Sequence, residues 1–325
     1  MALPVVAALL AAAGTAALLR WRRHLPLASP NARTLHTTPI PRVGGLAIWL
    51  GWLPVAGIAS ASPAFGVGVW GPPWLLLAAV SLLDDIRGVA IAPRLAVHAV
   101  AAVWFAIAVG RIAETGDAVI FFTVAVVVVA WALNLYNFMD GSDGLAALMT
   151  LLGFASYGAV LLHAGLPATL ALALAAATLP VLIVNRPPAR IFLGDVGAVP
   201  LGFLAAALGI GGIVDGAWSP WFPILVFLTF IADATVTLAR RALRRERFWE
   251  GHKMHYYQRL HQLGAGHAGT LAVFGALMLG TAGTAVACAC LKPEWGAPAL
   301  VAWCTVCALL FAAIDYHWRR RTRVT

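Results

Sequence analysis

Two side-chain amides and two carboxylates lie within ten residues of one another, directly after an apolar segment, residues 119–133. They belong to Asn134, Asn137, Asp140 and Asp143. A carboxylate at the centre of a transmembrane helix costs about 2.5–3.5 kcal/mol on insertion scales, so polar groups beside a bilayer need water, a partner or a ligand. The cluster therefore predicts a functional site at the end of an apolar helix, with both amides on one helix face.

Two more acidic places are predicted on the same side of the membrane. Asp84 and Asp85 end an apolar segment, where they repel each other and where the helix dipole disfavours anions. Asp195 lies between Gly194 and Gly197, which allow close backbone approach, as at phosphate sites. Mg²⁺ prefers amide and carboxylate oxygens and is usually held by few protein groups plus substrate phosphates. We therefore expect the three acidic places to converge beside one divalent ion.

A further cluster lies in the long basic connection that begins at Arg240. His252, His255, Gln258 and Arg259 are spaced three, three and one apart, which predicts one helical face of cationic or hydrogen-bond-donating groups. Such a face suits a phosphate or a sugar nucleotide. The His-x-x-His spacing also suggests zinc, but the sequence offers no obvious third ligand.

Three other features have structural interpretations. Asp233 lies inside an apolar segment with Arg240 two turns further on the same face, which favours an ion pair or a hydrogen-bonded brace over catalysis. The stretch from Gly264 to Gly269 is interpreted as a flexible entry into an apolar segment. The first basic loop, residues 33–45, contains two prolines and two glycines, and its interpretation as connector or functional element stays open.

The composition places this chain in a membrane. It has 325 residues, of which 62% are hydrophobic and 11% are charged, whereas soluble domains carry about 25% charged residues. Many apolar runs approach the 20 residues that cross a bilayer. We therefore predict an all-α polytopic membrane helix bundle of about eleven transmembrane helices, forming a single domain over residues 1–325. The predicted spans are residues 2–19, 46–62, 70–83, 95–109, 119–133, 145–162, 167–184, 199–214, 221–239, 271–291 and 297–314.

The basic residues predict the orientation of these spans. With the N-terminus outside and the C-terminus cytoplasmic, all but Arg111 and Lys292 of the 22 Lys and Arg face the cytoplasm. The net charge of +9 is thus a topology signal that also attracts anionic lipids, and it does not indicate nucleic-acid binding. Because polar residues gather at one surface and not at the midplane, an enzyme is favoured over a pore. The loops predicted to form its active site are 20–45, 84–94, 134–144, 185–198 and 240–269.

Together these motifs resemble the polyprenyl-phosphate N-acetylhexosamine-1-phosphate transferases of the glycosyltransferase 4 type. This family includes the lipid I synthase of peptidoglycan and enzymes that start O-antigen. The His-x-x-His-x-Tyr-Gln-Arg form is most similar to the O-antigen-initiating branch. The matching elements are Pro39-x-Pro41-x-x-Gly44-Gly45, Asp84-Asp85 with Arg94, Asn134-x-x-Asn137-x-x-Asp140-Gly-x-Asp143-Gly-Leu145, Phe192-Leu-Gly-Asp195-x-Gly197, Asp233, and His252-x-x-His255-Tyr-Tyr-Gln258-Arg259.

The resemblance implies an enzyme of the bacterial cytoplasmic (inner) membrane, with its active site facing the cytoplasm. It would transfer a sugar 1-phosphate from a UDP-N-acetylhexosamine, either N-acetylglucosamine or a 6-deoxy sugar, to undecaprenyl phosphate and release UMP. The cofactor would be Mg²⁺, with Mn²⁺ as the alternative, and a homodimer is left open. Asn137 and Asp195 match metal ligands, and Asp84, Asp85 and Asp195 match catalytic positions. The implied substrate-binding residues are Arg94, Asn134, Asp140, Asp143, His252, His255, Gln258 and Arg259.

Two departures and two alternatives accompany this resemblance. Ala198 and Arg94 stand where a Ser and a Lys are usual in the family. A CDP-alcohol phosphotransferase is disfavoured, because no Arg follows Ala147 and no acid occurs between Asp143 and Asp195. A non-catalytic transporter of lipid-linked sugars is disfavoured, because the spans lack paired charges.

Overall fold

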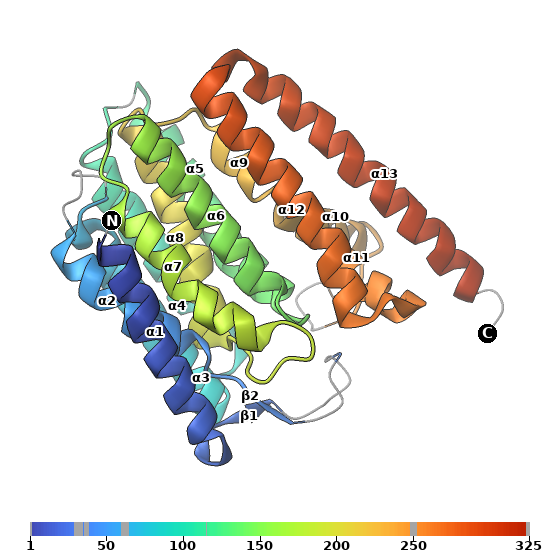
Figure 1. The fold of residues 1–325 in the computed structure, drawn as a ribbon. Coiled ribbons are helices and arrows are strands. Elements are labelled where there is room, and N and C mark those ends of the chain that lie inside the picture. Colours follow the sequence, from blue (N-terminus) through green and yellow to red (C-terminus); the bar gives the residue numbers. More distant parts are fainter. Residues whose placement is uncertain are drawn as a thin grey trace.

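Helices occupy each of the eleven apolar segments that the sequence predicts to cross a membrane (Figure 1). The computed structural model describes residues 2–28, 35, 39–59, 65–114, 116–247 and 252–322. The main helices are α1 (Ala2–Arg20), α2 (Gly45–Ile58), α3 (Val67–Arg87), α4 (Ile91–Gly110), α5 (Ala118–Met139), α6 (Leu145–His163), α7 (Thr169–Asn185), α8 (Asp195–Val214), α9 (Trp221–Val226), α10 (Leu228–Leu243), α11 (Tyr256–Leu260), α12 (Gly266–Leu291) and α13 (Gly296–Thr322). Two short strands, β1 (Leu27–Ala28) and β2 (Ile40–Pro41), pair antiparallel between α1 and α2.

Eight helical stretches in the described residues are long and apolar enough to cross a membrane. The apolar helices α2 and α7 are shorter, with 14 and 17 residues. The third predicted span had only 14 apolar residues and needed its flanks; α3 has 21 residues and includes them. An all-helical, multi-span architecture is therefore confirmed, while the count of eleven crossings and the outward N-terminus stay predictions.

The ninth predicted span is not one continuous helix. It is divided at Phe227 into α9 and α10. The Phe227 ring packs 5.7 Å from the Tyr157 ring and 6.1 Å from the Tyr136 ring, and it fills the space that a side chain on Gly153 would need. The break therefore coincides with an aromatic cluster between helices, which local sequence does not reveal.

Helix α8 is the centre of the bundle. It contacts α2, α3, α5 and α6, and its residues from Val196 to Gly212 are buried. This explains why its sequence is apolar on all faces. Asp195 is the first residue of α8. Its carboxylate therefore lies at one end of this buried helix, where the ends of the neighbouring helices meet.

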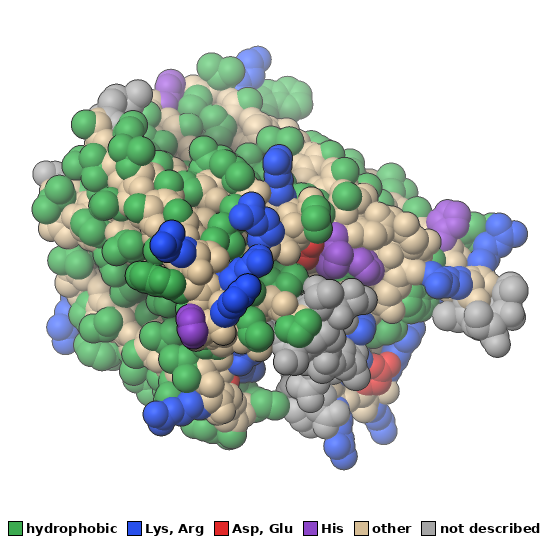
Figure 2. Space-filling model, turned by 60° about the horizontal axis from the view of Figure 1, so that its bottom comes forward, with side chains coloured by type: hydrophobic (Ala, Val, Ile, Leu, Met, Phe, Trp, Pro, Cys, Tyr) green, Lys and Arg blue, Asp and Glu red, His purple; other side chains and the backbone are tan. Residues whose placement is uncertain are grey.

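Helices α12 and α13 form a long pair along one side of the bundle (Figure 1), with α12 packed directly against α6, and with α10 and α11 in contact with both helices of the pair. The polar connections collect at one end of the helices. Figure 2 shows this end, across which Lys and Arg side chains are scattered while few Asp and Glu are visible. The candidate site is built at this basic end.

Candidate active site

One arginine joins the first and third acidic places. Arg94 Nη1, on α4, lies 2.8 Å from Asp84 Oδ2 and 3.1 Å from Asp195 Oδ2. Asp84 also accepts a hydrogen bond from the Val89 N–H at 2.5 Å, which fixes its carboxylate beside the end of α3. The predicted convergence of Asp84 and Asp195 is therefore confirmed, and Arg94 is the group between them.

Asp85 points in a different direction from Asp84. It is 1% exposed, and its two oxygens accept hydrogen bonds from the N–H groups of Asp195 at 3.2 Å and Val196 at 2.8 Å. Asp85 thus satisfies the free N–H groups that begin α8, as an N-cap residue would. The geometry gives the two adjacent acids separate tasks: Asp84 faces Arg94, and Asp85 holds the start of α8.

Arg42 is a member of this cluster that sequence reasoning did not single out. Its guanidinium donates to the Asp85 carbonyl at 2.8 Å and lies 3.6 Å from the Asp85 carboxylate. A cation at the C-terminal carbonyls of α3 offsets the unfavourable dipole that the acid pair meets there. The available signal was its place between Pro41 and Gly44 in the first basic loop, and the structure shows that residues 39–45 of this loop contact the start of α8.

Two glycine contacts bring this loop against the start of α8. The Gly44 and Gly45 N–H groups donate to the carbonyls of Phe192 and Leu193 at 2.8 and 2.9 Å. A Cβ on Gly194, whose φ is +74°, would lie 1.8 Å from the Arg42 carbonyl oxygen. Only glycine fits this approach, which places the loop of Asp195 beside Arg42.

Replacing Asp85 with Ala is expected to lower the free energy of unfolding by about 2–4 kcal/mol, because two buried N–H groups lose their acceptors. The matched control is Asp117→Ala. Asp117 caps α5 through the Val119 and Ile120 N–H groups, but it is exposed, so about 1 kcal/mol is expected. Thermal unfolding of the purified proteins measures both. Equal losses would contradict the structural role of Asp85.

The turn after α5 carries the second acidic place. The pKa of Asp140 is raised well above the usual range, first by burial and then by the like charges of Asp195, Asp85 and Asp143. Asp140 is therefore close enough to Asp195, Asp85 and Asp143 to interact with them electrostatically, and we call Asp84, Asp140 and Asp195 with Arg94 the acidic cluster. Asn137 lies in the last turn of α5, three residues earlier. Asn134 donates its amide to the Ala130 carbonyl at 2.8 Å, so that part of its side chain is engaged by its own helix.

Asp143 is oriented by groups from two distant segments. Its Oδ2 accepts a hydrogen bond from the Ala189 N–H at 2.9 Å, and its Oδ1 lies 3.5 Å from His267 Nδ1. His267 also contacts the Ser142 hydroxyl at 3.1 Å. The stretch from Gly264 to Gly269 was predicted to be only a flexible entry into a helix, but it brings His267 to the acidic turn. The signal was a histidine among glycines, whose φ values at Gly264 and Gly266 are positive.

The residues that follow position 251 do not form one helical face. Helix α11 begins at Tyr256, with His255 as its N-cap and His252 before it, so the prediction that treated them as one helix was wrong. The rings of His252 and His255 stack at 4.9 Å, and that of His255 lies 5.8 Å from Phe138. Burial and then His255 lower the pKa of His252 to about 4, so it is a neutral group near pH 7. Residues 248–251 of this connection lie outside the described residues.

Gln258 and Arg259 are turned into the protein. Gln258 Oε1 accepts a hydrogen bond from the His255 N–H at 3.2 Å, forming a capping box for α11. Arg259 donates to Asp315 of α13 at 2.7 Å and is 8% exposed. In this structure both residues stabilise α11, so contact with a substrate remains a prediction for them.

Asp233 is the brace that the sequence suggested, but with other partners. It is fully buried, and its carboxylate accepts hydrogen bonds from the N–H groups of Tyr256 and Tyr257, both at 2.9 Å, and contacts His255 Nδ1 at 3.2 Å. Arg240, its expected partner, pairs with Asp315. The Tyr257 hydroxyl in turn donates to the Phe138 carbonyl at 2.9 Å. Asp233 therefore positions α11 against the turn that carries Asp140.

Replacing Asp233 with Ala is expected to speed trypsin cleavage at Lys253 and Arg259 by about tenfold, because two buried N–H groups lose acceptors and α11 loosens. The control is Thr237→Val, which removes one donor to Asp233 and keeps the side-chain shape. Thr237→Val should stay within about twofold of the unmodified protein. If both variants behave alike, the bracing role is wrong.

The oxygen donors of the acidic cluster and of Asn137 are of the kind that suits a divalent cation. After burial, repulsion from Asp195, Asp85 and Asp143 raises the pKa of Asp140, and a cation would relieve that repulsion. Within the described residues, no group of three or more His, Cys, Asp or Glu side chains is arranged to hold a metal. Mg²⁺ is usually held by few protein ligands together with phosphate oxygens, and Asn137, Asp140 and Asp195 carry the hard oxygen atoms that such an ion prefers.

The chain is similar in sequence to known proteins. Residues 69–213 match the model of glycosyl transferase family 4. The chain is 32% identical over 286 residues to the decaprenyl-phosphate N-acetylglucosaminephosphotransferase of Mycobacterium tuberculosis (strain H37Rv), covering 74% of this chain and 70% of the relative. It is 28% identical over 265 residues to the probable undecaprenyl-phosphate N-acetylglucosaminyl 1-phosphate transferase of Bacillus subtilis, covering 73% and 70%. It is 31% identical over 123 residues to the phospho-N-acetylmuramoyl-pentapeptide-transferase of Thermotoga neapolitana, covering 38% and 39%.

Proposed function

Because the chain belongs to the polyprenyl-phosphate N-acetylhexosamine-1-phosphate transferases of glycosyl transferase family 4, we propose that it transfers N-acetylhexosamine 1-phosphate from a UDP-linked donor to undecaprenyl phosphate. The relatives are named for N-acetylglucosamine phosphate transfer to undecaprenyl or decaprenyl phosphate. The product would start a lipid-linked cell-surface glycan in the bacterial cytoplasmic membrane. O-antigen is the glycan that the His252 to Arg259 motif favours.

One observation carries this proposal: the bridge from Asp84 through Arg94 to Asp195, with Asp140 under the electrostatic influence of Asp195, at the basic end of an apolar bundle. In the proposed reaction, an acceptor phosphate oxygen attacks the β-phosphorus of the UDP-sugar. The bond from that phosphorus to the oxygen bridging both phosphates breaks, and UMP leaves. Both reactants are anions, so the main task of the site is to neutralise and orient charge.

The residues divide this task by position. Arg94, which contacts both carboxylates, would receive the acceptor phosphate. Asn137 and Asp195 would hold Mg²⁺ with Asp140 beside them, and the ion, when bound, would neutralise the diphosphate and the departing UMP. Asp143, oriented by Ala189 and His267, would contact the nucleotide. His252, being neutral, would donate a hydrogen bond and not a charge.

An apolar groove offers a place for the prenyl chain of the acceptor. This cavity of about 380 Å³ runs between α5, α8 and the broken pair α9 and α10. Leu135 and Tyr136, at one part of it, are within one turn of Asn137, and Ile213 and Pro220 line another part. A hydrocarbon chain here would bury apolar surface while its phosphate stays near Arg94.

Replacing Asp84 with Asn is expected to reduce turnover by a similar factor, about tenfold or more, at pH 8 and at pH 5.5. A phosphate monoester has its second pKa near 6, so at pH 8 the acceptor is already ionised and hardly needs a general base. We therefore assign Asp84 to positioning the lipid phosphate through Arg94. Near-normal turnover at pH 8 with a loss confined to pH 5.5 would support proton abstraction by Asp84 instead.

Reconstitution tests the reaction. Purified protein receives undecaprenyl phosphate and a panel of UDP-N-acetylhexosamines, and both the nucleotide and the lipid products are measured. We expect UMP and lipid-linked sugar diphosphate in equal amounts, with both requiring the acceptor and disappearing on chelation of Mg²⁺. Release of UDP would indicate transfer of the sugar without phosphate, and turnover of a CDP-alcohol would indicate the other phosphotransferase class. Either result would overturn the proposal.

A further inference from the structure

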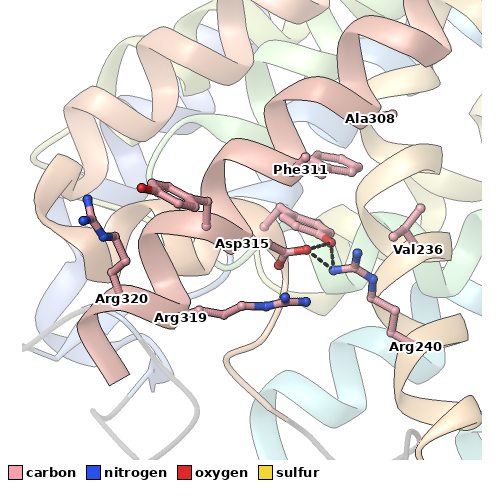
Figure 3. Close-up of a pocket in the computed structure, with 10 residues that line it drawn as sticks. Val236, Arg240, Ala308, Phe311, Asp315, Arg319 and Arg320 are labelled. Carbon is pink, nitrogen blue, oxygen red and sulfur yellow. Dashed lines mark hydrogen bonds and ion pairs between the residues drawn. The ribbon is translucent and has the colours of Figure 1, made fainter. Parts of the chain in front are cut away.

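A cavity of about 650 Å³ lies between α10, α11 and α13 (Figure 3), and none of the residues of the acidic cluster lines it. Arg240 of α10 and Tyr256 of α11 form one side. Asp315, Arg319 and Arg320 of α13 form the other. In Figure 3, Arg240 and Arg319 extend toward the space beside Asp315. None of the roles proposed above uses this cavity.

The polar wall of this cavity favours an anion. Three arginines line it, against one carboxylate. That carboxylate, Asp315, is already paired with Arg240 and with Arg259 behind it. Arg319 and Arg320 line the cavity from the exposed end of α13, so the lining carries more positive than negative side chains.

The remaining wall is apolar and continues onto the surface of α13. Val236, Ala308, Phe311 and Ala312 line it, and Leu309 beside them is exposed. Helix α13 then changes from an apolar sequence to Trp318-Arg319-Arg320-Arg321. Aromatic and basic residues at such a change occupy the headgroup level of a bilayer, because their stems remain in apolar surroundings. A ligand that carries both phosphate and hydrocarbon matches both walls.

We propose that this cavity binds the phosphate headgroup of an anionic phospholipid of the surrounding bilayer. The phosphate lies beside Arg240 and Arg319, while Arg320, which also lines the cavity, extends away from them over the Tyr316 ring (Figure 3), and the acyl chains follow the apolar side of α13. Basic pockets between transmembrane helices are known to take such headgroups. Arg240 also donates a hydrogen bond to the hydroxyl of Tyr256, the first residue of α11. A ligand that binds Arg240 is therefore linked through Tyr256 to α11, whose N-cap is His255. The site is separate from the donor and acceptor sites of the proposed reaction.

Native mass spectrometry of the full-length protein in detergent tests this proposal. The probes are phosphatidylglycerol and phosphatidylcholine with identical acyl chains. The double variant Arg319→Gln/Arg320→Gln is expected to lose phosphatidylglycerol binding by about tenfold or more and to keep its weak phosphatidylcholine binding. The matched control is Arg22→Gln/Arg23→Gln, which removes the same charge from exposed residues after α1 and should change binding less than about twofold. Equal phosphatidylglycerol retention in all three proteins would overturn the proposal.

Two further measurements identify the source of the phosphate and protect against a folding defect. Millimolar inorganic phosphate should not displace phosphatidylglycerol; displacement would show that the cavity takes a soluble phosphate and that the lipid assignment is wrong. Ala308→Trp fills the apolar wall without changing the charge. It should also lower phosphatidylglycerol binding about tenfold, because the acyl chains lose their place. Unchanged binding in Ala308→Trp would contradict a lipid ligand.

Discussion

Replacing Asp195 with Asn should lower turnover by about 10²–10³-fold, which corresponds to about 3–4 kcal/mol of lost transition-state stabilisation. The substitution keeps the size of the side chain and removes its charge. It therefore removes the ion pair between Asp195 and Arg94. The hydrogen bond that Asp195 makes for the fold uses its backbone N–H, which donates to Asp85 and is unaffected. The variant should therefore fold normally and be inactive, as measured by UMP release and by thermal unfolding.

The matched control for this variant lies on the same helix. Asp215→Asn makes the same change at the opposite end of α8, twenty residues after Asp195. It should keep turnover within about twofold, since substitutions away from a site have small effects. If Asp195→Asn and Asp215→Asn have equal turnover, Asp195 has no part in the chemistry.

Removing the charge of Arg94 should have an effect of similar size. Arg94→Gln leaves Asp84 and Asp195 without their shared cation, and loss of charged hydrogen bonds worth about 1.5–3 kcal/mol each predicts a decrease of at least about 10²-fold in kcat/KM. The control is Arg87→Gln, an exposed arginine at the end of α3, which should be nearly silent.

The structure also predicts that lysine can replace Arg94. A single nitrogen, Nη1, makes both contacts, and the Nε of Arg94 is buried without a partner. A lysine ammonium, which is a compact point charge, reproduces that arrangement. Arg94→Lys should therefore keep turnover within about tenfold, which agrees with lysine being usual at this position in the family. A loss as large as in Arg94→Gln would mean that the planar guanidinium itself is needed.

The sequence was sufficient to predict the helices because apolar runs and basic flanks report directly on a membrane. The exceptions arise from packing between distant residues. Pro223 lies inside α9, four residues before Phe227, so the break between α9 and α10 does not fall at a helix-breaking residue. The break accompanies the contact of Phe227 with Gly153 and Tyr157. The 14-residue third span was recognised as too short, and α3 indeed extends to Arg87.

The acidic residues of the site could be predicted from the sequence, whereas the residues that pair with them could not. Carboxylates at the C-terminal end of an apolar helix, such as Asp84 and Asp85 in the last turn of α3, are unfavourable and therefore conspicuous in a sequence. Arg42 and His267 reach Asp85 and Asp143 only through contacts between segments far apart in the chain. Arg259 was misplaced for another reason: its spacing from His252 assumed a helix that in fact begins at Tyr256. Periodicity assigns a face only where the helix is continuous.

Binding of Mn²⁺ in the presence of UMP, followed by electron paramagnetic resonance, tests the central claim most directly. The claim is that the acidic places at the ends of α3, α5 and α8 serve one divalent ion. We predict one bound ion per protein chain, with affinity lost at least about tenfold in Asp195→Asn and retained in Asp215→Asn. Equal binding by Asp195→Asn and the unmodified protein, or no ion bound by either, would contradict the account.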